Sequence, residues 1–159
     1  MTKHSSIDPI QIQPNAPNLD EILALVKRNF DEMEGRIDPP SSVPDLTVAD
    51  LRNQAAQEEI WTIGDPPCAC VFLSRQNSVL YIGRLAVDKE RRTNSLARKL
   101  LELAAERAKS MGLAELELAT RVELKENHAA FERLGFTFHD YGTHEGYSKP
   151  TYLILRKSV

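Results

Sequence analysis

Arginine and small polar residues separate a hydrophobic segment from an amphipathic one in the run Arg92-Thr93-Asn94-Ser95-Leu96-Ala97. Residues 79–87, before this run, have the composition of a buried strand, and the residues after it repeat leucine and alanine at helical spacing. The first N–H groups of a helix have no partner within the helix, and the helix dipole makes this end positive. A strand that turns into a helix here therefore predicts a site for an anion, in particular a phosphate group.

Positive side chains accompany this turn. Arg91 and Arg92 stand at its entrance and Arg98 falls in the first turn of the helix, so guanidinium groups could add charge-assisted hydrogen bonds to those of the backbone. Arginine pairs beside a helix are also common on solvated surfaces. The glycines that usually let a backbone approach a phosphate are missing. We expect a phosphate to be able to bind with Ser95 in place of a glycine, because the turn needs backbone N–H donors more than it needs positive φ at every residue.

A long amphipathic helix must position this turn. Residues 96–111 place apolar side chains at helical spacing and charged side chains on the other side. Gly112 follows, and glycine commonly ends helices. The apolar positions are Leu96, Leu100, Leu103, Ala104, Ala108 and Met111.

A second segment with a distinctive order of residues follows this helix. A strand is predicted over residues 115–122, and then comes the run Asn127-His128-Ala129-Ala130-Phe131-Glu132-Arg133-Leu134-Gly135-Phe136. Taken with the strand, turn and helix before it, this order and spacing resembles the GNAT superfamily of acyl-CoA-dependent N-acetyltransferases. The resemblance is specific over residues 79–136 and extends to nearly the whole chain.

Two motifs carry the resemblance. The family's pyrophosphate motif reads Arg or Gln, two residues, Gly, one residue, then Gly or Ala. Arg92 takes its first position, Ser95 stands where the first Gly usually does, and Ala97 takes the last position. The later motif is an Asn followed by a short helix that ends in Tyr-Glu-Lys-Leu-Gly-Phe. Asn127 is similar to that Asn, and Phe131 occupies the place of the usual Tyr.

The resemblance implies acetyl-CoA as the cosubstrate. Its pyrophosphate would lie on the N–H groups of the turn, and its pantetheine arm would pair like an extra strand with residues 85–87, where the family's strand ends splay apart. Asn127 would reach the pantetheine amides or the thioester, and Phe131 would line the sulfur. The implied coenzyme-binding residues are Leu85, Ala86, Val87, Arg92, Thr93, Asn94, Ser95, Leu96, Ala97, Arg98, Asn127 and Phe131.

Acetyl transfer to an amine needs a held thioester, a neutral amine and a proton for the departing thiolate. A free thiol has a pKa of about 8.5, so the thiolate can leave with modest help. Phe131 cannot give that help. Tyr141, Tyr147 and Tyr152 are the candidate acids, and we expect Tyr147 because its loop, residues 142–150, should border the acceptor. Each tyrosine could instead be a half-buried packing residue.

The same loop carries the candidate base. His144 titrates near neutral pH and could accept the amine proton directly, whereas Glu145 could do so through water. Glu117 and Glu123 are alternatives if they face the cleft. Adjacent polar residues on a loop are also often simply solvated.

The remaining elements complete a fold of the α/β (α+β) class. We expect one GNAT-like domain over residues 1–159, with residues 1–8 as a loose tail, and a mixed, mostly antiparallel twisted sheet of about six to seven strands with helices on both faces. The further elements are an edge strand at residues 10–13, a helix capped by Asn18, a helix from Thr47 to about Gln57, and strands over residues 60–63, 68–73, 136–141 and 151–157.

Composition limits the function classes. A formal charge of −3 gives no global attraction to nucleic acid. No apolar stretch is long enough to span a membrane, and residues 1–6 lack the apolar core of a signal peptide, so we expect a cytoplasmic protein without membrane partners. Cys68 and Cys70 have no companion ligands at suitable spacing, which predicts reduced thiols and no metal.

Three readings of function remain open. The leading one is an acetyl-CoA-dependent transferase that acts on a primary amine of a small molecule or peptide within a ternary complex, either alone or as a homodimer. The second is a GNAT-like module that binds coenzyme A and regulates without turnover, as Phe131 and Ser95 would allow. The third is an interaction domain whose turn binds no coenzyme. Product formation separates the first two readings, and coenzyme A affinity separates the second from the third.

Overall fold

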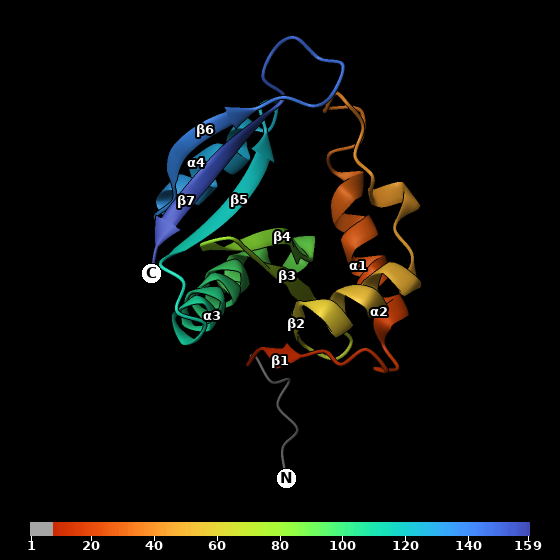
Figure 1. Ribbon diagram of the computed structural model, residues 1–159. Coiled ribbons are helices and arrows are strands. Elements are labelled where there is room, and N and C mark those ends of the chain that lie inside the picture. Colours follow the sequence, from red (N-terminus) through yellow and green to blue (C-terminus); the bar gives the residue numbers. More distant parts are fainter. Residues whose placement is uncertain (1–7) are drawn as a thin grey trace.

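A seven-stranded sheet forms the centre of the computed structural model, which describes residues 8–159 and, for residues 93 and 94, the backbone alone (Figure 1). Apart from Asp8, the predicted tail lies outside the described residues. The strands are β1 (Ile10–Gln11), β2 (Glu59–Ile63), β3 (Ala69–Gln76), β4 (Val79–Val87), β5 (Glu115–Arg121), β6 (Thr137–Gly142) and β7 (Tyr152–Ser158). The helices are α1 (Leu19–Asp31), α2 (Val48–Gln57), α3 (Leu96–Ser110) and α4 (Lys125–Arg133), with 3₁₀ turns η1 (Val43–Asp45) and η2 (Lys89–Asn94).

The strands follow the order β1-β2-β3-β4-β5-β7-β6. Strands β1 to β4 form an antiparallel meander, α3 then crosses over, and β5 pairs with β4 in parallel. The last strand, β7, inserts between β5 and β6 and is antiparallel to both. The predicted fold class is therefore confirmed, including the mixed and mostly antiparallel sheet.

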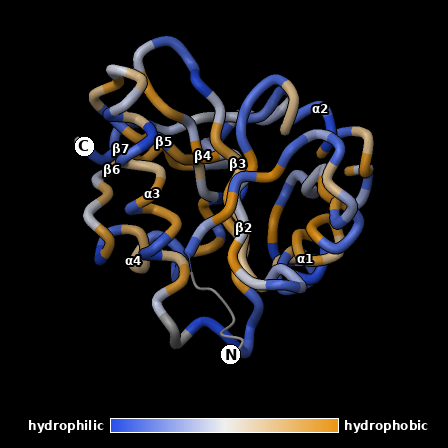
Figure 2. Tube along the Cα trace, turned by 90° about the horizontal axis from the view of Figure 1, so that it is seen from below, coloured by the Kyte–Doolittle hydropathy of each residue, from blue (hydrophilic) through white to orange (hydrophobic). Residues whose placement is uncertain are grey.

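Each face of the sheet has its own apolar core. Leu100 and Ala104 of α3 pack with Leu116 of β5 on one face, and α4 covers the same face through Phe131. On the other face, α1 and α2 pack against Phe72 and its neighbours. In Figure 2, the chain is coloured by hydropathy, and apolar and polar residues alternate along the helices and strands. The buried residues of α1 are Leu19, Ile22, Leu25, Val26 and Phe30.

Helix ends follow local sequence signals. Thr47 and Asp50 form a reciprocal capping box at the start of α2, as their spacing predicts. Helix α3 ends at Ser110, one residue earlier than predicted, and Gly112 follows with φ +75°. The Leu113 N–H donates to the Ala108 carbonyl, which satisfies one of the free carbonyl groups at the helix end.

A β-bulge interrupts β4. Phe72 pairs with Arg84 and Leu73 pairs with Ile82, so Gly83 is an extra residue in β4. An extra residue reverses the side-chain alternation beyond it. Ile82 accordingly packs in the core beneath α3, whereas Ala86, an even number of residues later, packs in the core beneath α1 and α2. The bulge thus turns the side chain of Arg84 towards the α1 face.

Strands β4 and β5 separate after a short paired stretch. Their parallel pairing runs only from Val79 with Glu115 to Ile82 with Leu118. Beyond that point β4 continues along β3 to Val87, and β5 continues along β7 to Arg121. The two ribbons diverge in Figure 1. The resulting gap gives β4 an unpaired inner edge.

Candidate active site

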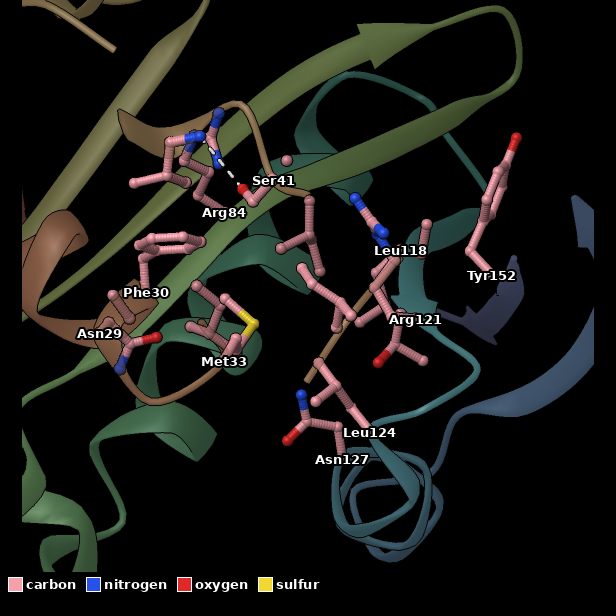
Figure 3. Close-up of a pocket in the computed structure, with 18 of the residues that line it drawn as sticks. Asn29, Phe30, Met33, Ser41, Arg84, Leu118, Arg121, Leu124, Asn127 and Tyr152 are labelled. Atoms are coloured by element: carbon pink, nitrogen blue, oxygen red, sulfur yellow. Dashed lines mark hydrogen bonds between the residues drawn. The ribbon is translucent and has the colours of Figure 1, made fainter. Parts of the chain in front are cut away.

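Two adjoining cavities lie along the unpaired edge of β4, the larger between β4 and β5 and the smaller between β4 and α4. The larger, of about 500 Å³, lies between the diverging strands, α1, the segment of residues 37–43 and the β6–β7 loop. The smaller, of about 340 Å³, extends towards η2 and the start of α3. Figure 3 shows side chains of α1 facing those of β5 and α4 across the larger cavity. Six residues line both cavities, namely Asn29, Met33, Leu85, Leu124, Asn127 and Phe131.

The inner edge of β4 presents backbone groups to these cavities. The Val87 carbonyl accepts hydrogen bonds from Asn29 Nδ2 at 3.2 Å and from Arg92 Nε at 3.1 Å, so it points away from β3. In an antiparallel strand, the N–H and C=O of one residue leave on the same side and alternate along the chain. Leu85 therefore directs both backbone groups into the gap, and Ala86, paired with Cys70, directs its own towards β3.

The predicted phosphate turn begins α3 with an unusual backbone. Ser95 has φ +58° and ψ +29°, the left-handed conformation in which glycine is favoured, and its side chain makes no capping hydrogen bond. The family's glycine at this position is therefore replaced by a residue that still adopts the glycine-like conformation. Ser95 and Ala97 line the smaller cavity, whereas Leu96 is buried in the core.

Arg92 and Arg98, two of the predicted coenzyme-binding residues, differ in their surroundings. Arg92 lines the smaller cavity, but its guanidinium is paired with Glu32 at the end of α1, with Nη1–Oε1 and Nη2–Oε2 distances of 2.7 and 2.8 Å. Arg98 is exposed and lines neither cavity. The side chains of Thr93 and Asn94 lie outside the described part of the structure.

Asn127 and Phe131 stand one turn apart on α4, at the junction of the two cavities. Because α4 begins at Lys125 after Leu124, Asn127 lies within the first turn and does not cap the helix. Its side chain points towards the cavity in Figure 3. Phe131 packs edge-on against Phe136 with ring centroids 5.8 Å apart.

The β6–β7 loop brings one of its three predicted residues to the larger cavity. His144 lines it, and the Oγ1 of Thr151 lies 2.9 Å from the backbone nitrogen of His144 and 2.5 Å from its Nδ1. Burial, followed by the positive charge of Arg121, lowers the pKa of His144. The neutral imidazole is therefore favoured, which is the form that can accept a proton.

Tyr147 and Glu145 line neither cavity. The Tyr147 hydroxyl donates to Asp38 Oδ1 at 2.5 Å, and this hydrogen bond raises the pKa of Tyr147. The hydrogen bond from Tyr147 to Asp38 therefore links the β6–β7 loop to the segment after α1. Glu145 is exposed.

Of the alternative candidate acids and bases, one tyrosine lines the larger cavity and the others do not. Tyr152 lines the larger cavity, and its ring lies edge-on to His144 with centroids 5.2 Å apart. Tyr141 is exposed on β6. Glu117 accepts from Arg156 Nε at 2.9 Å, and Glu123 Oε2 accepts from the Asp38 N–H at 3.2 Å; neither lines a cavity.

The residues that line the larger cavity include Tyr81, Arg84 and Arg121, which are not among the site residues predicted from the sequence. Burial, followed by the charge of Glu117, raises the pKa of Tyr81. A signal for two of them exists in the sequence, since Tyr81 and Arg84 interrupt an otherwise apolar strand. Their faces could not be assigned because the bulge at Gly83 was not predicted.

Among residues 8–159, no group of three or more His, Cys, Asp or Glu side chains is arranged to hold a metal ion. Cys68 and Cys70 are buried free thiols, and burial raises the pKa of Cys70 to about 12. No helix in this part of the chain is both long and apolar enough to cross a bilayer.

Solved structures share this architecture. The PaiA N-acetyltransferase from Thermoplasma acidophilum, in complex with coenzyme A, is similar over 96% of this chain and 98% of that chain, with a TM-score of 0.79 and 13% identity. Aminoglycoside 6'-acetyltransferase type Ii is similar over 94% and 96%, with a TM-score of 0.72 and 17% identity. Nourseothricin acetyltransferase, at 23% identity and a TM-score of 0.58, is matched over 64% of this chain and 65% of that chain.

The sequence itself gives the family. No curated protein sequence matches the chain. The acetyltransferase (GNAT) family, however, matches residues 23–136, which include most of α1, the splayed strands β4 and β5, the turn before α3 and the whole of α4. This match covers well over half of the 159 residues. The chain therefore belongs to the acetyltransferase (GNAT) family.

Proposed function

We propose that the protein transfers the acetyl group of acetyl-CoA to a primary amine by direct attack within a ternary complex. The observation that carries this proposal is the meeting of two cavities at Leu85, Asn127 and Phe131, where β4 has an unpaired edge. A transferase that joins two substrates directly needs two such compartments, with the reacting atoms at their junction.

Coenzyme A is assigned to the smaller cavity. Its pyrophosphate would lie on the N–H groups at residues 93–97, as at other helix N-termini that bind phosphate. The pantetheine arm would pair with the backbone of Leu85 and with the N–H of Val87, since the Val87 carbonyl already accepts from Asn29 and Arg92. Asn127 would reach the thioester end, and Phe131 would lie against the sulfur. Binding of coenzyme A by the PaiA enzyme, which shares this fold, supports the assignment.

The acceptor is assigned to the larger cavity. The amine nitrogen would attack the thioester carbonyl carbon, a C–N bond would form, and the C–S bond would break as the thiolate leaves. His144, neutral and at the wall of this cavity, would take the proton that the amine loses. The departing sulfur would gain a proton from Tyr152, which replaces Tyr147 as our candidate because Tyr152 lines the cavity.

A module that binds coenzyme A without turnover remains the second candidate. The observation that favours it is Phe131, which stands at the junction without a hydroxyl group. A thiolate of ordinary basicity can leave with little help, so an aromatic ring here is compatible with slow catalysis as well.

A calorimetric titration with coenzyme A, followed by an assay of thiol release, tests the proposal. We expect one saturable site per chain, and thiol release from acetyl-CoA that depends on an added amine. Saturable binding without release for any amine would favour the non-catalytic module. Absence of binding at millimolar coenzyme A would reject both the transferase and the non-catalytic coenzyme A-binding module. The cytoplasmic location and the homodimer stay predictions, which cell fractionation and light scattering would test.

A further inference from the structure

The larger cavity has an unusual balance of charge. Its lining includes the guanidinium groups of Arg84 and Arg121 and the imidazole of His144. Within the described part of the chain, no aspartate or glutamate lines it. A cavity with low-dielectric walls concentrates the field of its charged groups, so this compartment attracts anions.

Arg84 is the central feature of this field. It lies on β4 next to Leu85, and the bulge at Gly83 aims its side chain at the α1 face (Figure 3). Arg84 is only partly exposed, and burial lowers its pKa. Among residues 8–159 it has neither an ion pair nor a hydrogen bond for its guanidinium. Five donors in a desolvated environment without an acceptor are costly unless a ligand supplies one.

The other arginine at the cavity is already engaged. Arg121 Nη1 donates to the Pro39 carbonyl at 2.5 Å, which fixes the arginine against the segment after α1. Its charge still acts on the cavity, because it helps to lower the pKa of His144. Arg121 therefore contributes positive potential, and Arg84 contributes free donors.

Three carboxylates whose charges reach Arg84 or His144, or whose hydrogen bonds tie the neighbouring loops, have other partners. Oε1 of Glu123 is nevertheless buried without a hydrogen bond among residues 8–159, and the charge of Glu123 acts to raise the pKa of His144 against the larger effects of burial and Arg121. Asp50, whose charge reaches Arg84, accepts from the N–H and the hydroxyl of Thr47 in the capping box of α2. Asp38 accepts from Tyr147, and Glu123 accepts from the Asp38 N–H. None of them neutralises Arg84 through a direct contact.

We propose that the acceptor amine carries a compact oxyanion, a carboxylate or a phosphate, which binds the guanidinium of Arg84. The proposal rests on the function proposed above and names the substrate class of the same site. Because Arg84 adjoins Leu85, where the two cavities meet, an acceptor the size of a small amino acid could place its oxyanion on Arg84 and its amine at the junction. Planar, bidentate recognition of such groups is the interaction for which arginine is best suited.

The test compares matched amines on the full chain saturated with coenzyme A. The probes are glycine and β-alanine, their carboxamides glycinamide and β-alaninamide, and phosphoethanolamine beside ethanolamine. Affinity is measured by thermal shift and calorimetry, and acetylation is measured separately with acetyl-CoA. The variants are Arg84→Gln, Arg84→Lys and Arg84→Met. The control for an equal change in net charge is Arg75→Gln, at an exposed residue near the end of β3.

At least one anionic probe should bind about tenfold to a hundredfold more tightly than its neutral analogue, the range for a charge-assisted pair. Arg84→Lys should keep part of this preference, and Arg84→Gln and Arg84→Met should lose it while coenzyme A affinity stays unchanged. Arg75→Gln should behave like the parent protein. Whichever of carboxylate and phosphate binds more tightly identifies the group.

Equal affinity for anionic and neutral probes, no binding of any anionic probe, or a preference that survives in Arg84→Gln or Arg84→Met would overturn the inference. Retained coenzyme A affinity shows that each variant is folded. Turnover of neutral amines without any anion preference would leave the proposed function standing and reject this inference. Anion binding that depends on Arg84, without turnover of any amine, would support the anion site at Arg84 and reject the proposed transferase function.

Discussion

Arg92 and Glu32 form a bidentate ion pair that joins η2 to the end of α1, with N–O distances of 2.7 and 2.8 Å. Hydrogen bonding from Arg92 is the main reason that the pKa of Glu32 is lowered. The side chains are 39% and 40% exposed, so solvent screens the pair and its contribution to stability is small. Its importance lies in where it holds Arg92, because this arginine takes the position of the family's pyrophosphate ligand.

Removing the carboxylate should release Arg92 for the coenzyme. Glu32→Gln is expected to raise the affinity for coenzyme A, because the negative charge that competes with the pyrophosphate disappears. Arg92→Ala should weaken binding by about 1 to 3 kcal/mol, the range for losing a charge-assisted hydrogen bond. Calorimetry on both variants checks these outcomes.

The matched control is Arg28→Ala. Arg28 of α1 pairs with Asp88 at 3.1 Å, which is a second ion pair between the same elements, but it lines neither cavity. Its loss should leave coenzyme A affinity nearly unchanged. Equal affinities for Arg92→Ala and the parent protein would show that the pyrophosphate site has been misplaced.

Ser95→Gly should stabilise the fold without weakening the site. A left-handed conformation costs a residue other than glycine about 1 to 2 kcal/mol, and glycine adds roughly 0.5 to 1 kcal/mol of unfolded-state entropy, so a net gain of about 0.5 kcal/mol is expected. Asn77→Gly, at φ +51° in the β3–β4 hairpin, is the control and should gain less because asparagine tolerates this conformation. Urea unfolding measures both, and a destabilised Ser95→Gly protein would contradict the argument.

Phe131→Tyr should keep coenzyme A affinity and raise the rate of acetyl transfer. The ring remains packed against Phe136, and the added hydroxyl would lie at the junction of the cavities, where the sulfur is expected. The test is amine-dependent thiol release at saturating acetyl-CoA. A rate no higher than that of the parent would mean that protonation of the thiolate does not limit turnover.

The tyrosine that protonates the sulfur can be identified by two matched substitutions. Tyr152→Phe should lower the rate about tenfold to a hundredfold, since a thiolate of this basicity leaves partly unaided. Tyr147→Phe should have little effect on the chemical step, because Tyr147 is bonded to Asp38 outside both cavities. If Tyr147→Phe alone loses rate, the loop must move to bring that hydroxyl into the site.

The pH profile should report His144 as the base. Its pKa is lowered by burial and by Arg121, so the neutral form is present at neutral pH and is lost only as the pH falls below the usual imidazole value. The parent should therefore lose kcat/KM on the acid side below about pH 6.5. His144→Gln should be slower and should lack this limb. An acid limb that is unchanged in the variant would assign it to another group.

The elements that position the site could largely be predicted. The apolar composition of residues 79–87 predicts β4, and the apolar periodicity of residues 96–111 predicts α3 and hence the turn before it. The helix carrying Asn127 is implied by the family resemblance alone. These features are local, since each is encoded within one window of sequence. The splay of β4 from β5 was implied by the same resemblance.

The side-chain arrangement of the site could not be predicted, because it depends on contacts between distant residues. Arg92 meets Glu32 across 60 positions, and Tyr147 meets Asp38 across 109. The single extra residue at Gly83 decides which face of the sheet Arg84 occupies. A glycine within a strand is compatible with a bulge and with regular pairing, so the sequence alone does not predict this face.

The most direct test of the central claim is the initial-velocity pattern of amine-dependent thiol release, with acetyl-CoA and an accepted amine varied together. Direct transfer at the junction of the two cavities predicts intersecting double-reciprocal lines and one acetylated amine for each thiol released. Parallel lines would indicate an acetylated protein intermediate. Saturable binding of acetyl-CoA without amine-dependent release would contradict the claim that the site is catalytic.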